Sequence, residues 1–141
     1  MKALKGKIVV VYCLLLLLLG SCCDSMQLAL IEEQFGVAFD EVTIDSLSTK
    51  EQWNELGLTD GVKCVSIYTS TEDVLKIYQS ISQKEEMKRG VLQDLLFDEY
   101  VHPSYGNTEV FYCVKQPQKD ETCYLILDIE HGIIYYYLIM I

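Results

Sequence analysis

The sequence has few residues and no motif that point to catalysis. Its two histidines are His102, which precedes a proline, and His131, which lies in a short turn, and both are better explained as loop residues than as catalytic bases. No segment resembles a nucleophile elbow, a phosphate-binding loop, a Cys-x-x-Cys pair or a His-Glu-x-x-His helix. We therefore expect a protein that is not an enzyme and that binds no cofactor.

The chain is also poor in positive charge. Eleven Lys and Arg stand against 21 Asp and Glu, which gives a net charge of -10. Three lysines (Lys2, Lys5 and Lys7) precede a leucine run, so a chain without its first 21 residues would carry -13. Such a surface disfavours nucleic acid and anionic headgroups and favours a basic protein partner. The simpler interpretation is that acidity only keeps an exported domain soluble.

No repeat, low-complexity tract or linker divides residues 26–141. The whole chain has 141 residues, of which 50% are hydrophobic and 11% aromatic, and this is enough for one hydrophobic core. We therefore expect a single domain over residues 26–141.

The one long apolar run lies near the N terminus. Residues 1–7 carry three lysines, and the uncharged apolar residues 8–19 follow directly. A membrane-spanning helix needs about 20 apolar residues, so this run is too short to span a bilayer. A basic start followed by a short apolar segment is typical of a signal peptide. We expect residues 1–21 to be removed from the mature protein.

Residues 19–22, Leu-Gly-Ser-Cys, resemble the lipobox of bacterial lipoproteins, in which a cysteine receives a diacylglycerol before cleavage. Cys22 fits better than Cys23, because choosing Cys23 would put Gly20 where the pattern has a Leu-like residue. The resemblance covers residues 1–22 alone. It implies that Cys22 is the lipidated N terminus, that residues 22–25 form a short tether, and that acyl chains hold the protein on a membrane of the bacterial cell envelope, at its periplasmic or surface face. The alternative is an ordinary secretory signal with cysteines near the cut.

Hydrophobic periodicity predicts an α+β domain with helices packed on a mainly antiparallel sheet that ends in a C-terminal three-stranded β-meander. The expected elements are a helix at 25–35, a strand at 37–44, a short helix capped by Ser48 or Thr49 and ending at Gly57, a strand at 62–69, a helix capped by Ser70 whose charged end, 84–90, stops at Gly90, a helix at 91–101, and strands at 109–115, 122–130 and 133–141.

The last strand, residues 133–141, is apolar on both faces. Such a strand is normally central in a sheet that is covered on both sides, and we favour this interpretation. If one face were uncovered, Tyr135, Tyr136, Tyr137 and Leu138 would form a hydrophobic patch of the kind that marks a protein interface.

A disulfide is predicted between Cys113 and Cys123. If the hairpin turn is centred on Gln118, these two residues face each other across the strands. Directly opposed residues have Cα atoms about 4.5 to 5.5 Å apart, which a disulfide tolerates, and an extracytoplasmic compartment is oxidising. The alternative is two buried thiols on one strand face, because the register of a hairpin can slip.

The best candidates for a metal site are Asp128, Glu130 and His131. The two carboxylates point to the same side of a strand, and the histidine follows directly. Three polar residues at the end of a hairpin are more commonly just solvated, so we expect no metal.

Three hypotheses for the function follow. The first is a membrane-anchored, non-catalytic binding protein, such as an inhibitor or immunity-type partner of a basic protein. The second is a structural or accessory lipoprotein of an envelope assembly that docks through its terminal strand. The third, a metal-dependent envelope enzyme, needs residues that the sequence does not supply in any recognisable pattern.

Overall fold

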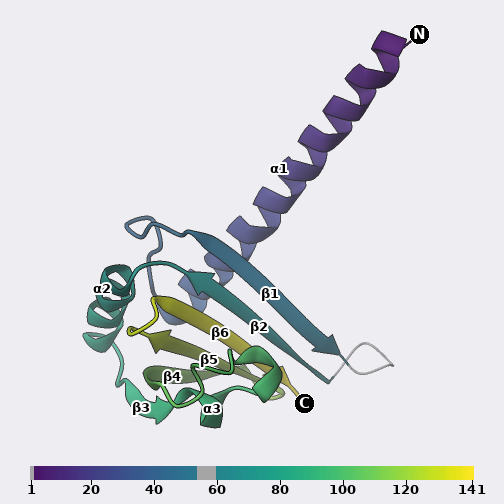
Figure 1. The fold of residues 1–141 in the computed structure, drawn as a ribbon. Coiled ribbons are helices and arrows are strands. Elements are labelled where there is room, and N and C mark those ends of the chain that lie inside the picture. Colours follow the sequence, from purple (N-terminus) through teal and green to yellow (C-terminus); the bar gives the residue numbers. More distant parts are fainter. Residues whose placement is uncertain (1, 54–59) are drawn as a thin grey trace.

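The computed structural model describes residues 2–53 and 60–141, with only the backbone described for residues 2–6 and 16–23. The elements are α1 (Lys2–Phe35), β1 (Ser46–Trp53), β2 (Gly61–Tyr68), α2 (Thr71–Ser82), β3 (Lys88–Val91), α3 (Leu92–Leu95), the 3-10 helix η1 (Asp98–Tyr100), β4 (Glu109–Gln118), β5 (Glu121–Asp128) and β6 (Ile133–Met140). The six strands form one antiparallel sheet in the order β1-β2-β6-β5-β4-β3, with helical segments packed on it (Figure 1). The predicted α+β class is confirmed.

Strand β6 is central, between β2 and β5, and is buried on both faces as predicted. Tyr136 packs in one core with the C-terminal part of α1 and with α2, whereas Tyr135 and Tyr137 pack in a second core under the segment 92–108. These three tyrosines are at most 3% exposed, and Leu138 is partly buried against the first core. The less favoured alternative, an interface patch at Tyr135, Tyr136, Tyr137 and Leu138, is therefore wrong.

The predicted helix at 25–35 is the C-terminal third of the much longer helix α1. Ile31 and Phe35 are buried in the first core, and Gly36 ends the helix with a φ of 66°, which glycine adopts without steric cost. The N-terminal part of α1 projects away from the sheet (Figure 1). Among the described residues, no helix combines the length and apolarity that a membrane crossing requires.

Two predictions between residues 37 and 57 are wrong. Residues 37–44 form an irregular segment instead of a strand, although Val37 and Phe39 are each only 5% exposed. The apolar side chains in this segment pack against the core, but the segment has no neighbouring strand to pair with among the described residues. The expected helix over 50–57 is the strand β1 as far as Trp53, and its remainder lies outside the described residues. All eight β1 residues pair with β2. This pairing overrides the helix propensity of the segment, which is too short to form a stable helix alone.

The middle of the chain is predicted in part. Strand β2 and helix α2 lie where expected, and the Ser70 side chain accepts a hydrogen bond from the Asp73 N–H at 3.1 Å. Helix α2 ends at Ser82, however, and the charged segment enters strand β3, in which Gly90 lies opposite Val110. A Cβ atom on Gly90 would lie 3.1 Å from the Tyr112 ring, so this glycine permits close packing and does not cap a helix.

The expected helix at 91–101 is broken into α3 and η1, with Leu96 and Phe97 extended between them. The β-meander at the C terminus is confirmed, and β4 is three residues longer than predicted. The short helical pieces α3 and η1 still direct Leu92, Leu96 and Tyr100 into the second core.

We expect Gly132→Ala to lower the free energy of unfolding by at least about 2 kcal/mol, measured by urea denaturation. Gly132 has a φ of 68°, which costs an L-residue about 1 to 2 kcal/mol, and an added Cβ would lie 2.7 Å from the Thr69 carbonyl oxygen. Gly36→Ala is the matched control, because its φ is 66° but no atom lies within 4 Å of the added Cβ. Equal losses in the two variants would contradict the close approach at Gly132.

Candidate functional site

A cavity of about 570 Å³ lies on the sheet face that the segment 92–108 covers. That segment packs over the tyrosines of β6 but leaves the same face of β1 exposed, so the cavity forms at the border of the covered area. Its walls come from β1, β2, β6, η1 and two loops. The lining residues are Lys50, Tyr68, Asp98, Glu99, Tyr100, Val101, His102, Pro103, Tyr105, His131, Ile133 and Tyr135.

A buried carboxylate fixes the orientation of His131 at this cavity. Asp128 is fully buried at the end of β5, and its Oδ1 accepts the His131 backbone N–H at 3.0 Å while its Oδ2 lies 2.8 Å from His131 Nδ1. Because an ionised carboxylate can only accept, we assign the proton of this hydrogen bond to Nδ1. In the neutral ring, Nε2 is then left as a hydrogen-bond acceptor.

Tyr105 joins the two histidines. Its ring stacks on His131 with centroids 3.7 Å apart, and the His102 ring lies 4.6 Å from it at an angle of 34°. His102 Nδ1 accepts the Ser104 N–H at 3.2 Å, which holds the loop that carries Tyr105. The sequence analysis placed the histidines in two unrelated loops, and only tertiary packing brings them together.

Tyr135 presents a polar group to the cavity. The residue as a whole is 3% exposed, and no hydrogen bond joins its hydroxyl to another described residue. Burial raises the pKa of this hydroxyl, and the charge of Asp128 raises it further. Tyr100 is similar, because burial and then the Glu99 carboxylate raise its pKa. Both hydroxyls therefore stay neutral at physiological pH and can donate or accept a hydrogen bond.

The rim of the cavity is mainly acidic. Asp98 and Glu99 are exposed, and neither carboxylate has an ion pair within the part of the chain that the structure describes. Lys50, on the edge strand β1, is the one Lys or Arg side chain in the lining. Sequence reasoning did not find this site because no pair of its charged or aromatic residues forms a recognisable motif.

The predicted metal candidates do not assemble into a site. Both oxygens of Asp128 bind His131, and Glu130 is exposed to solvent. Among the described side chains, no group of three His, Cys, Asp or Glu is arranged to hold a metal ion. Asp128 and His131 instead stabilise the turn between β5 and β6.

The predicted Cys113–Cys123 disulfide is not present, and both residues are free thiols. Cys113 lies opposite Leu125 and Cys123 lies opposite Lys115, because the hairpin turns at residues 119 and 120, between Gln118 and Glu121, and is not centred on Gln118. The two cysteines are thus diagonal neighbours, at a Cα separation of typically about 7 to 8 Å, beyond the usual reach of a disulfide. The structure agrees with the alternative interpretation, in which the two cysteines are buried thiols. Cys22, the predicted lipidation site, has a described backbone but no described side chain.

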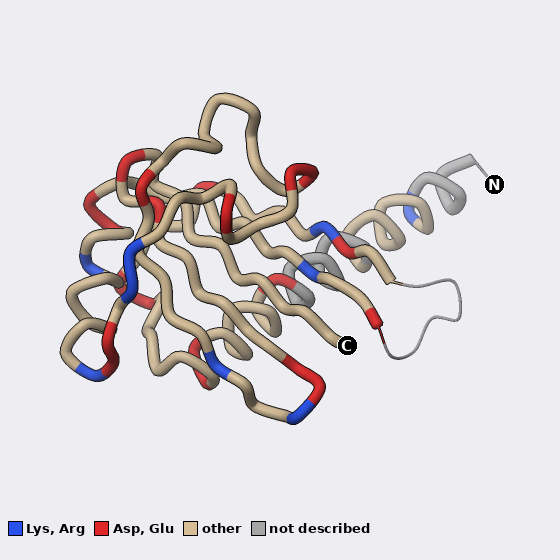
Figure 2. The backbone as a smooth tube through the Cα atoms, turned by 90° about the horizontal axis from the view of Figure 1, so that it is seen from below, with Lys and Arg blue, Asp and Glu red and all other residues tan. Residues whose placement is uncertain are grey.

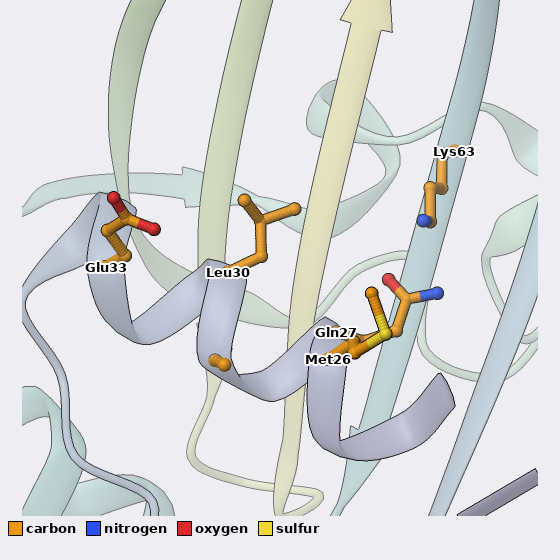
Figure 3. A pocket seen from close by; sticks show the side chains of 6 residues that line it. Met26, Gln27, Leu30, Glu33 and Lys63 are labelled. Carbon is orange, nitrogen blue, oxygen red and sulfur yellow. The ribbon is translucent and has the colours of Figure 1, made fainter. Parts of the chain in front are cut away.

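A second hollow, of about 540 Å³, lies along the flank of α1 (Figure 3). Met26, Gln27, Ala29, Leu30 and Glu33 of α1 line it together with Lys63 of β2. Its lining is largely apolar, and Met26 is 71% exposed. It contains no cluster of polar groups comparable to the histidine and tyrosine side chains of the first cavity.

The chain matches no known protein family, no curated protein and no solved structure.

The buried thiols predict a loss of stability at alkaline pH. Burial raises the pKa of Cys64 to about 11 and that of Cys113 to about 12, from an ordinary value of 9.0. Above pH 9 the unfolded chain releases these protons while the folded chain retains them. The free energy of unfolding should therefore fall by up to about 1.4 kcal/mol per pH unit for each thiol.

Urea denaturation between pH 8 and 10 measures this slope before most tyrosines ionise. The variant with Cys64→Ala and Cys113→Ala loses some packing energy at every pH, but its stability should decline less steeply with pH. Parallel curves for the variant and the unmodified protein would show that these thiols do not control the alkaline loss.

Proposed function

We propose that this protein is a lipid-anchored, non-catalytic binding module of the bacterial cell envelope, whose acidic domain binds a basic protein close to the membrane. The proposal combines the lipobox resemblance at Cys22 with the geometry of α1 and with the charge of the domain.

The observation that carries the anchor is the exposed apolar part of α1. The Ile, Val, Tyr and Leu side chains from Ile8 to Leu15 are all more than half exposed, and this part of the helix lies away from the sheet (Figure 1). Exposed apolar surface of this extent indicates an interaction with a membrane or a partner, or a segment that is removed. A signal peptide accounts for it, because such a segment inserts in the membrane during export and is then cleaved.

The domain begins almost directly after Cys22. Helix α1 continues from this position to Phe35, and Ile31, nine residues further along, is already fully buried. At a rise of 1.5 Å per residue, about 14 Å of helix separate the lipidation site from the core. The short tether expected at residues 22–25 is therefore helical in the structure, and the domain would be held near the bilayer.

The charge supports a basic partner. Without the first 21 residues, and hence without their three lysines, the net charge falls from -10 to -13. Acidic residues lie in most loops and strand ends of the domain, and basic residues are sparser (Figure 2). A field of this sign accelerates association with a basic protein and repels acidic ones.

A second candidate is the accessory lipoprotein of an envelope assembly, and the edge strand β1 favours it. β1 pairs with β2 on one side and has no second partner among the described strands. An open edge of eight residues can accept a strand from a neighbouring protein. Docking through the terminal strand, as the sequence suggested, is excluded because β6 is central.

The anchor is tested by Cys22→Ala. We expect this variant to lose labelling by radioactive palmitate and to remain as the longer precursor, because the thiol that receives the lipid is missing. Cys23→Ala is the matched control and should be labelled and processed normally. Normal labelling and processing of Cys22→Ala would refute the lipid anchor at this residue.

The partner is tested by capture from membranes solubilised in mild detergent. A basic partner held by charge should be recovered at about 50 mM salt and lost at about 1 M, at which the screening length is only about 3 Å. Recovery of an equally abundant partner at both salt concentrations would contradict a charge-driven complex. It would favour assembly through β1, in which backbone hydrogen bonds dominate.

A further inference from the structure

We propose that the cavity of about 570 Å³ binds the guanidinium group of an arginine side chain. This inference rests on the proposed function, because it names the chemical group through which the basic partner is recognised. It concerns the cavity between β1, β6 and η1, which the sequence did not reveal.

The polar groups of the cavity are mainly acceptors. In the neutral ring, His131 Nε2 is an acceptor because Nδ1 donates to the buried Asp128. Tyr135 lines the cavity, and no hydrogen bond joins its hydroxyl to another described residue. This hydroxyl can therefore accept a hydrogen bond from a ligand that enters the cavity. A guanidinium group offers five N–H donors and no acceptor, which matches this set.

The walls of the cavity suit a planar cation. Four tyrosine rings line it, from Tyr68, Tyr100, Tyr105 and Tyr135. Cations bind over aromatic faces, and the guanidinium group also stacks on them through its planar surface. The volume lies in the range of about 300 to 1,000 Å³ typical of ligand sites, which leaves room for residues next to the arginine.

The acidic residues at the rim also favour a cation. Asp98 and Glu99 have no ion pair within the described part of the chain, so a cation entering the cavity would not have to displace one. A carboxylate can also accept two parallel hydrogen bonds from a guanidinium group, which a lysine ammonium cannot form. Lys50 opposes binding, and its removal should therefore strengthen it.

The experiment uses the full-length lipoprotein in neutral detergent micelles and two small probes. The first probe is N-acetyl-L-arginine amide, and the second is N-acetyl-L-citrulline amide, which has nearly the same shape but no charge. Nuclear magnetic resonance of labelled histidine and tyrosine rings reports binding. We expect saturable shifts at His131, Tyr105 and Tyr135 with the arginine probe, and at least about tenfold weaker binding of the citrulline probe.

Charge variants should change the affinity for the arginine probe in both directions. Asp98→Asn and Glu99→Gln should each weaken binding of the arginine probe by about twofold to fivefold, the range of exposed ion pairs, and Lys50→Gln should strengthen it by a similar factor. Glu41→Gln is the control, because it removes one exposed carboxylate that does not line the cavity. Tyr135→Phe keeps the ring but removes the hydroxyl, and it should also weaken binding.

Three outcomes would overturn the inference: no saturable binding of the arginine probe, equal binding of both probes, or weaker binding after Lys50→Gln. The proposed function is tested separately by the captured partner. If the partner is captured equally by Asp98→Asn, Glu99→Gln and the unmodified protein, the cavity is not its binding site, although the function stands. If the probe binds but no basic partner is captured, the site exists and the proposed function fails.

Discussion

The double-sided burial of β6 is the constraint on which the rest of the fold depends. Ile134 and Tyr136 require cover on one face of the sheet, and Tyr135 and Tyr137 require it on the other. A strand of this kind can be stable only inside a sheet that has a layer on each side. The end of α1 and helix α2 supply one layer, and the segment 92–108 supplies the second. The second layer leaves β1 exposed, and the border of this layer shapes the candidate site.

The second layer consists of two short helical pieces and a loop. It buries Leu92, Leu96 and Tyr100 over the centre of the sheet but does not extend across β1. The cavity lies where this layer ends, which explains its mixed lining: apolar rings belong to the margin of the core, and charged groups belong to the surface. The Asp128–His131 interaction fixes one wall, because it combines a buried carboxylate with the tight turn at Gly132. The need to cover both faces of β6 thus determines both the layers of the fold and the position of the cavity.

The sequence predicted the elements whose signals are local. The Ser70 cap, the β-meander and the central position of β6 follow from residues that are close in the chain. It failed where a distant partner decides the structure, as for β1 and β3, whose residues adopt strands because β2 and β4 offer edges to pair with. The disulfide prediction failed because the hairpin turns at residues 119 and 120 and not at Gln118, so that Cys113 does not lie opposite Cys123. The cavity could not be predicted, since the stacking of His102, Tyr105 and His131 depends on how a loop folds over the sheet.

The unbroken course of α1 past Cys22 has a consequence for orientation. A domain on a flexible linker reorients freely relative to its anchor. A domain whose anchoring helix runs directly into the core takes a fixed orientation relative to the first turn of that helix. If Cys22 carries the proposed lipid, the sheet would keep a restricted tilt toward the bilayer, because Ile31 and Phe35 of the same helix are fixed in the core. The domain would then present the same side to its surroundings throughout, and a partner that also lies on the membrane would meet it in a narrow range of poses.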